Sequence, residues 1–295
     1  MQLKATGTIK LPDATGTLFD HGAFEPRSRR VFVAHTARDR VEVIDRGHLA
    51  TLRGFPEAAG VVADDGHVLI TNRGAARLAW LDAYSLEKRA EFETGLRPNG
   101  VAFISRLKLA VVACIGDETH DAVLQALDLE GHGRWEIDLP GRPRWCVTDV
   151  DGARVFLAIR DPSMVLVARL PELDRVQLWH PPSAGAHGID IDDQGKRLYI
   201  ACDGGALVEV DTTVGRVRRE WPLAGVPDAT FFNPASGLVH VAISEPGLVH
   251  SVNTRTGASS QFTTARGAKT TALVAPDGLY VFSPSHNGVL GLVET

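Results

Sequence analysis

Short apolar runs separated by turns follow one another along the whole chain. Residues 31–34 (Val-Phe-Val-Ala), 155–158 (Val-Phe-Leu-Ala) and 198–201 (Leu-Tyr-Ile-Ala) each come after a turn that is polar or contains Gly. Because β-branched and aromatic residues favour strands, each run is predicted to be a strand. A second turn leads to an alternating segment such as residues 207–211 (Leu-Val-Glu-Val-Asp), whose period of two also indicates a strand.

The same order of strands and turns returns at intervals of 38 to 46 residues, and no unit contains a convincing helix. The residues that open the first strand of the units are His21, Ala59, Asn99, Trp145, His187, Asp228 and Thr271. Such a repeat predicts an all-β, seven-bladed β-propeller with four antiparallel strands per blade. We expect residues 1–295 to form a single domain, with blades that start near residues 19, 57, 97, 143, 185, 226 and 269.

The two ends of the chain complete the pattern. The last unit contains only three strands, whereas residues 3–12 form a strand that belongs to none of the following units. We therefore predict that residues 3–12 pair as the outer strand of the last blade. This pairing closes the ring and covers a sheet edge that would otherwise invite aggregation.

Composition narrows the function classes. Hydrophobic residues make up 44% of the chain and charged residues 23%, which is enough apolar surface to exclude disorder as the main state. The net charge of -5, with no aromatic ladder beside the basic run at residues 27–30, argues against a nucleic-acid partner. Cys114, Cys146 and Cys202 form neither a disulfide framework nor a zinc ribbon.

No segment approaches the run of about 18 apolar residues that a membrane span needs, and residues 1–10 lack the apolar part of a secretory signal. We therefore expect a soluble, cytoplasmic protein without a membrane partner. The disc of a propeller is expected to be a monomer or a weak homo-oligomer.

The predicted fold brings distant residues together at one end of the central channel. The first residue of each inner strand lies at the channel mouth, so His21, Asn99, His187 and Asp228 are the candidate metal ligands, and His21 and His187 the candidate catalytic bases. An imidazole takes up a proton near neutral pH without large tuning of its pKa. The alternative is that polar side chains at these positions only satisfy backbone groups at the start of a strand.

A second set of residues is predicted to bind the substrate at the same mouth. Arg97, Arg144 and Arg160 offer guanidinium groups for a carboxylate or phosphate, and Trp145 narrows the channel unless it only packs against neighbouring strands. The ends of the second strands and the loops after them return to this face. They add His35 and His286 as candidate binding residues and also bring Arg73 and Asp203 there. The expected partner is a small anionic molecule. In the longest interval, the polar loop at residues 115–121 is either a cap for the mouth that could bind an ion or a solvated surface loop.

The repeating unit, with His-Gly or Asn-Gly, an Asp-Gly turn and Leu-Tyr-Ile-Ala, resembles the YVTN-repeat (YncE-like) propellers. It is also similar to the wider group of gluconolactonase and senescence-marker-protein enzymes and virginiamycin B lyase. The resemblance implies a divalent cation at the channel mouth, with Asn99 of Pro-Asn-Gly and Asp228 as ligands. His21 stands where that group has a glutamate, and His187 faces it across the ring. This softer set favours zinc, manganese or iron over calcium.

Three functions follow as hypotheses. The first is a lactonase-like hydrolase that acts on a small lactone or ester with the divalent metal at the channel mouth. The second is a non-catalytic propeller that binds a small anionic metabolite or a protein partner. The third is a metal-assisted lyase, with His21 or His187 as the base. Propeller blades of this kind occur in binding proteins and in enzymes with different chemistries. Only the residues at the channel mouth can therefore distinguish the three hypotheses.

Overall fold

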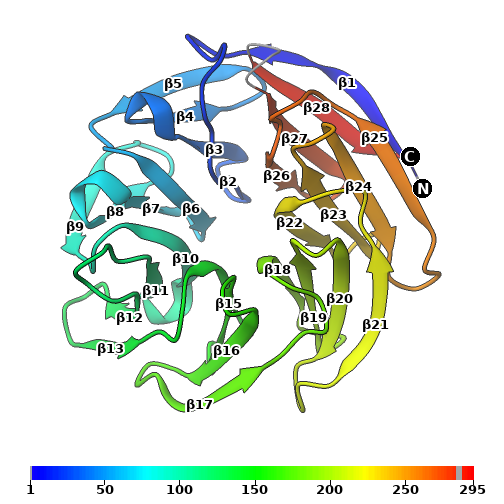
Figure 1. Cartoon of the computed structure of the whole chain (residues 1–295). Helices are drawn as coiled ribbons and strands as arrows, with labels where there is room; N and C mark the ends of the chain where they lie inside the picture. The colour runs from blue at the N-terminus through cyan, green and yellow to red at the C-terminus, as the bar shows by residue number, and fades with distance from the viewer. Residues whose placement is uncertain (1, 284–287) are drawn as a thin grey trace.

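Seven four-stranded antiparallel sheets stand around a central axis in the computed structural model, which describes residues 2–283 and 288–295 (Figure 1). Within these residues the structure contains no α-helix and only three short 3-10 turns, η1 (Thr36–Arg38), η2 (Arg73–Ala75) and η3 (Ser105–Leu107). The all-β, seven-bladed propeller predicted from the repeat is therefore confirmed. No helix in the described part of the chain is long and apolar enough to cross a membrane.

Each blade runs from an inner strand at the channel to an outer strand at the rim. Blade 1 contains β2 (Gly22–Glu25), β3 (Arg30–His35), β4 (Arg40–Ile44) and β5 (His48–Arg53). Blade 2 contains β6 (Ala58–Asp64), β7 (His67–Asn72), β8 (Arg77–Asp82) and β9 (Lys88–Glu93). Blade 3 contains β10 (Pro98–Ile104), β11 (Leu109–Cys114), β12 (Val123–Asp128) and β13 (Arg134–Asp138). Blade 4 contains β14 (Pro143–Thr148), β15 (Arg154–Ile159), β16 (Met164–Arg169) and β17 (Asp174–Trp179).

The remaining blades follow the same order. Blade 5 contains β18 (Ala186–Asp192), β19 (Arg197–Cys202), β20 (Ala206–Asp211) and β21 (Val217–Pro222). Blade 6 contains β22 (Pro227–Asn233), β23 (Leu238–Ile243), β24 (Leu248–Asn253) and β25 (Ser259–Thr263). Blade 7 contains β26 (Thr270–Val274), β27 (Gly278–Ser283), β28 (Gly288–Glu294) and β1 (Leu3–Lys10).

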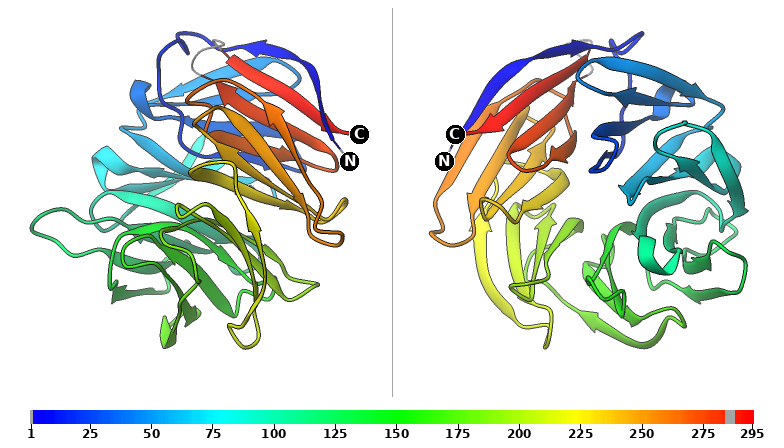
Figure 2. Two further views of the ribbon diagram at one scale, coloured as in Figure 1. Left: turned by 45° about the vertical axis from the view of Figure 1, so that its right-hand side comes forward. Right: turned by 180° about the vertical axis from the view of Figure 1, so that it is seen from behind.

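The N-terminal strand closes the ring as predicted. β1 pairs antiparallel with β28, from Leu3 opposite Glu294 to Lys10 opposite Gly288, and the two termini lie side by side (Figure 2). Glu294 also accepts hydrogen bonds from Asn233 Nδ2 at 2.6 Å and from the His240 ring at 2.8 Å. These bonds link the last blade to blade 6.

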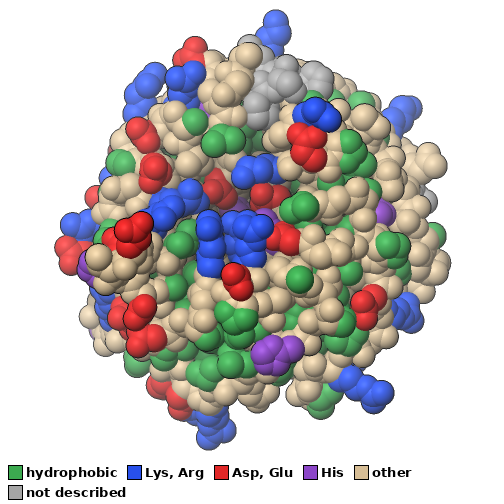
Figure 3. All heavy atoms as spheres, viewed as in Figure 1, with side chains coloured by type: hydrophobic (Ala, Val, Ile, Leu, Met, Phe, Trp, Pro, Cys, Tyr) green, Lys and Arg blue, Asp and Glu red, His purple; other side chains and the backbone are tan. Residues whose placement is uncertain are grey.

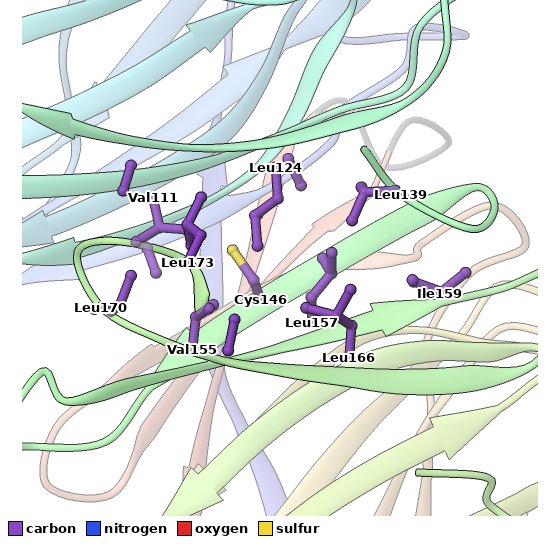
Figure 4. Close-up of a cluster of buried hydrophobic side chains, with 14 of the residues drawn as sticks. Val111, Leu124, Leu139, Cys146, Val155, Leu157, Ile159, Leu166, Leu170 and Leu173 are labelled. Carbon is purple, nitrogen blue, oxygen red and sulfur yellow. The ribbon is translucent and has the colours of Figure 1, made fainter. Parts of the chain in front are cut away.

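Apolar side chains fill the spaces between neighbouring blades. Middle strands such as β11 are buried along their whole length, which explains their continuous apolar runs, whereas outer strands such as β13 alternate between exposed and half-buried residues. Between blades 3 and 4, Cys146 points into a cluster of Leu, Ile and Val side chains (Figure 4). Burial raises the pKa of the Cys146 thiol to about 12, so this cysteine serves as a small apolar group.

Candidate functional site

The inner strands present their first residues to the channel through β-bulges. In blades 3 and 5 the ladder skips one residue, since Pro98 pairs with Cys114 and Gly100 with Ala113, which leaves Asn99 unpaired, and His187 is skipped in the same way. Arg144 and Trp145 lie in a similar shift of blade 4, and Asp228 in that of blade 6. A bulge turns a side chain away from the regular alternation of the strand. These side chains can therefore enter the channel mouth without breaking the rest of the ladder.

The glycines that follow the bulges allow neighbouring blades to approach. A Cβ atom on Gly100 would lie 2.4 Å from the carbonyl oxygen of Arg144, and one on Gly188 would lie 2.4 Å from that of Asp228. Both distances are too short for a side chain. The Asn-Gly and His-Gly pairs of the sequence thus combine a polar group for the mouth with a close contact to the next blade.

A cavity of about 200 Å³ lies at this mouth. Figure 3 shows Lys and Arg side chains gathered at the centre of one face of the disc, with acidic side chains among them. The polar and aromatic side chains that line the cavity are Asp20, His21, Arg73, Arg97, Asn99, Arg142, Arg144, Trp145, His187, Asp228, Thr230, Phe231 and Lys269. The structure therefore brings His21, Asn99, His187, Asp228, Arg97, Arg144 and Trp145 of the predicted set together.

Two of the other predicted residues lie away from the cavity. Arg160 does not line the cavity. Its Nε atom donates to Asp203 at 2.5 Å, and Asp203 in turn contacts His187, which lines the cavity. His35 at the end of β3 is fully buried, and both of its ring nitrogens are hydrogen-bonded, Nδ1 to Glu42 and Nε2 to Thr17. It therefore contacts the protein interior rather than a ligand. His286 lies outside the described residues.

His187 is held by a carboxylate on one side only. Its Nδ1 atom lies 2.7 Å from Oδ1 of Asp203, whereas its Nε2 atom lies 3.9 Å from Oδ1 of Asp228. Burial acts to raise the pKa of Asp203, but the hydrogen bond and charge of His187 and the charge of Arg160 outweigh it and lower that pKa. An ionised carboxylate only accepts, so Asp203 fixes the proton of neutral His187 on Nδ1 and leaves the Nε2 lone pair toward the cavity.

His21 forms a similar pair in blade 1. Its Nδ1 atom lies 2.6 Å from Oδ1 of Asp20, and Arg73 contacts the other oxygen of that carboxylate at 2.8 Å. Burial works against ionisation of Asp20, yet His21, Arg73 and Lys269 lower its pKa well below the ordinary range. Two imidazoles, each oriented by an aspartate, thus lie at one mouth.

Arginines dominate the charge of the cavity. Arg73 donates to Oδ1 of Asn99, and Arg144 Nη2 lies 3.4 Å from Nδ1 of His187. The Nε atoms of Arg73 and Arg144 are buried and have no hydrogen-bond partner among the described residues. Burial and the neighbouring arginines Arg142 and Arg160 lower the pKa of Arg144, against the opposing effect of Asp228 and Asp203.

The geometry fits the predicted divalent metal poorly. The Nδ1 atoms of His21 and His187 already bond to aspartates, and the Asn99 oxygen accepts from Arg73. Within the described residues, the group of His, Cys, Asp or Glu ligand atoms that lie within 4.8 Å of one another is Asp128, Glu130 and His132, on an exposed hairpin of blade 3. Cationic side chains also repel a metal ion. The metal therefore stays a prediction without geometric support.

Some residues of the site were not in the predicted set. Asp20, Arg142 and Lys269 lie one to three residues before the aligned positions of blades 1, 4 and 7, and Arg73 and Asp203, which directly follow the second strands β7 and β19, were expected at this face but were given no role. The repeat itself contains the signal that would have found them. In a propeller the residues just before an inner strand and just after the second strand meet at the same face.

No protein-family model matches the chain, and no curated protein matches it. Among solved structures, a streptogramin B lyase structure superposes with a TM-score of 0.80 at 12% identity, covering 99% of this chain and 97% of the other. The WD40 domain of Pan2 from Neurospora crassa superposes with a TM-score of 0.79 at 11% identity, covering 99% and 96%. At such identities the likeness shows the propeller fold alone, because this fold serves many functions.

Proposed function

We propose that the cavity at the channel mouth binds a small anionic molecule. One observation carries this proposal: among the described residues, five cationic side chains line the cavity against two carboxylates, although the whole chain has a net charge of -5. The cationic side chains are those of Arg73, Arg97, Arg142, Arg144 and Lys269.

Internal ion pairs neutralise only part of this charge. Arg73 pairs with Asp20 at 2.8 Å, and Lys269 lies 3.4 Å from Asp228. Arg97, Arg142 and Arg144 have no ion pair with a carboxylate among the described residues. A guanidinium group matches the planar oxygens of a carboxylate or phosphate, and such charge-assisted hydrogen bonds are strong. An anion would therefore satisfy groups that the protein leaves without partners.

The size of the cavity limits the ligand. A volume of about 200 Å³ lies below the roughly 300–1,000 Å³ that is usual for drug-sized ligands. The proposed ligand is accordingly a metabolite of a few carbon atoms, or the charged end of a longer molecule. The aromatic surface of Trp145 offers an apolar wall for its carbon atoms.

A second function, proton transfer on the bound anion, is favoured by the environment of His187. Asp203 holds Nδ1–H at 2.7 Å, and Arg160 holds Asp203 in turn at 2.5 Å, so the imidazole is fixed with Nε2 toward the cavity. A base oriented by a third group is the usual arrangement of general-base catalysis. The cluster of arginines would stabilise negative charge that develops when the proton leaves.

Elimination by a lyase and hydrolysis of a small lactone or ester both need such a base, so both predicted reactions are compatible with His187. In hydrolysis, Nε2 would take a proton from the attacking water, and in elimination it would take one from a carbon atom beside a carboxylate or carbonyl group. His187→Gln is expected to retain anion binding. It should lose the turnover of any substrate that a screen finds, whether a lactone or ester that is hydrolysed or an acid that undergoes elimination. Turnover that survives in His187→Gln would remove His187 from this role.

The binding proposal is tested by isothermal titration calorimetry with phosphate, sulfate and short carboxylates. Wild type is expected to bind at least one of them, and Arg144→Gln to weaken that binding by roughly tenfold or more, as expected for a charge-assisted hydrogen bond worth about 1.5–3 kcal/mol. Arg169→Gln is the matched control, since Arg169 lies at the far end of β16 and pairs with Asp174 at 2.7 Å. Equal binding by Arg144→Gln and the control would overturn the proposal.

A further inference from the structure

A second hollow adjoins the cavity at the channel mouth. It has a volume of about 880 Å³ and lies between the loop at residues 115–122, which links β11 to β12, and residues 139–142 before β14. Arg97, Ile115 and Arg142 line both hollows. The two spaces therefore meet at these three side chains, and the small cavity is the inner end of a longer site.

Arg97 and Arg142 stand at this junction without a counter-charge. Neither side chain forms an ion pair or hydrogen bond with a described residue. Burial and the charges of Arg160, Arg97 and Arg73 lower the pKa of Arg142, which shows that like charges crowd around it. Arg144, by contrast, lines the inner cavity but not the outer hollow. The positive charge thus falls into an inner group at Arg144 and an outer group at Arg97 and Arg142.

The backbone holds the outer arginines in place. Arg97 has a φ of 53°, a left-handed conformation that costs free energy for a residue other than glycine, and its carbonyl accepts from the Ile115 amide at 3.1 Å. Arg142 donates from its amide to Asp161 and accepts from the amide of Arg160 at 2.9 Å. Both side chains therefore project from fixed points on adjacent blades.

The loop side of the outer hollow carries acidic side chains. Asp117, Glu118 and Asp121 lie on the loop, and Asp117 already accepts from the amides of Thr119 and His120 at 2.8 and 2.9 Å. Carboxylates repel an anion. An anionic group that enters the outer hollow would be drawn to the side of Arg97 and Arg142 and kept away from the loop.

We infer that Arg97 and Arg142 form a second anionic subsite, so that the preferred ligand has two anionic groups, such as a dicarboxylate or a phosphorylated acid. One group would lie against Arg144 beside His187, and the other at the junction of the two hollows. This inference rests on the proposed anion binding and specifies its ligand class. A ligand with one anionic group would leave the outer arginines without a counter-charge.

The inference is tested by calorimetry at constant ionic strength with butyrate as the monoanion and succinate, glutarate, adipate and phosphoglycolate as dianions. At least one dianion is expected to bind wild type about tenfold more tightly than butyrate, the gain of one charge-assisted contact. Arg97→Gln and Arg142→Gln should each lose that preference, so that their affinity for the dianion falls at least about threefold further than their affinity for butyrate. Arg144→Gln should weaken both kinds of ligand, and Arg169→Gln should weaken neither.

The possible outcomes separate this inference from the function on which it rests. Binding of butyrate with no preference for any dianion would overturn the second subsite and leave the anion-binding proposal standing. A preference that survives in both Arg97→Gln and Arg142→Gln would also overturn it. Failure of every anion to bind wild type would end both proposals. Melting curves of each variant serve as a control that a lost preference does not come from unfolding. The comparison of butyrate with the dianions on wild type needs no variant.

Discussion

The imidazole of His21 in blade 1 lies flat on the indole of Trp145 in blade 4, with ring centroids 3.7 Å apart and planes inclined by 7°. The two residues belong to sheets on different sides of the ring, so this contact crosses the channel. Trp145 lines both the cavity at the mouth and a more apolar hollow deeper in the channel. The stacked pair therefore forms a floor under the proposed anion site.

Replacement of Trp145 should remove this floor. Trp145→Ala is expected to lower the free energy of unfolding by about 2–4 kcal/mol, because a large and partly buried aromatic side chain leaves a cavity. Trp145→Phe should lose less than half as much, since a phenyl ring can still stack on His21. Chemical denaturation of the three proteins measures the difference. Equal stability of wild type and Trp145→Ala would show that the stacking contributes nothing.

Deletion of residues 1–12 should destabilise the whole ring. The deletion removes β1, uncovers the edge of β28, and takes Leu3 and Leu11 out of buried clusters. We expect the melting temperature to fall by roughly 8 °C or more, since several kcal/mol of packing would be lost. The free edge should also promote aggregation, which light scattering detects. An unchanged melting temperature would mean that β1 does not close the last blade.

Asp190 should make stability depend on pH in the opposite sense to most carboxylates. It accepts from the amide of Phe232 in the next blade at 2.7 Å, and burial raises its pKa to about 6 from an ordinary value near 3.8. The folded state thus binds this proton more tightly than the unfolded state. The stability that Asp190 adds is complete below pH 3.8 and is lost as pH rises to 6, by at most about 3 kcal/mol.

The measurement compares wild type with Asp190→Asn, whose amide oxygen can still accept from Phe232. The difference in unfolding free energy between the two proteins should shift in favour of Asp190→Asn between pH 4 and pH 6 and then remain constant. The other carboxylates contribute equally to both proteins and cancel in this difference. A difference that does not change with pH would contradict the raised pKa.

The predicted metal has its own test. Metal analysis of the purified protein should find no divalent ion bound at the channel mouth, because the cationic cavity repels such an ion. Melting curves in zinc, manganese, iron and calcium should likewise show no stabilisation that depends on the residues of the mouth. His187→Ala and Asp228→Ala are the variants for this comparison. Stabilisation by a metal that both substitutions abolish would restore the metal-dependent reading of the site.

The repeat predicted the fold because every blade has the same order of strands and turns. The additional strand at residues 3–12 predicted that the N-terminus closes the ring in the last blade. It also predicted that His21, Asn99, His187 and Asp228 meet, since a shared position in the repeat becomes a shared position in space. The charge of the site was harder to predict. Arg73, Arg142 and Lys269 come from different places in the repeat, and their concentration at one mouth is invisible in a net charge of -5.

The hydrogen-bond partners of single side chains could not be predicted from the sequence repeat either. His35 at the end of a second strand and His187 at the start of an inner strand were both expected at the mouth, yet His35 is enclosed by Thr17 and Glu42, whereas His187 keeps one nitrogen toward the cavity. Residue 17 precedes the first blade and has no counterpart in the repeat, so no alignment of the blades would have shown this contact.

The bulges at the start of the inner strands have a consequence for protein engineering. Asn99 and His187 are omitted from the ladders that hold their blades together, whereas Gly100 and Gly188 maintain the spacing to the next blade. Exchange of the former residues should therefore alter chemistry at little cost in folding, provided that the glycines stay. A small combinatorial library at the omitted positions would turn this disc into a scaffold for new receptors.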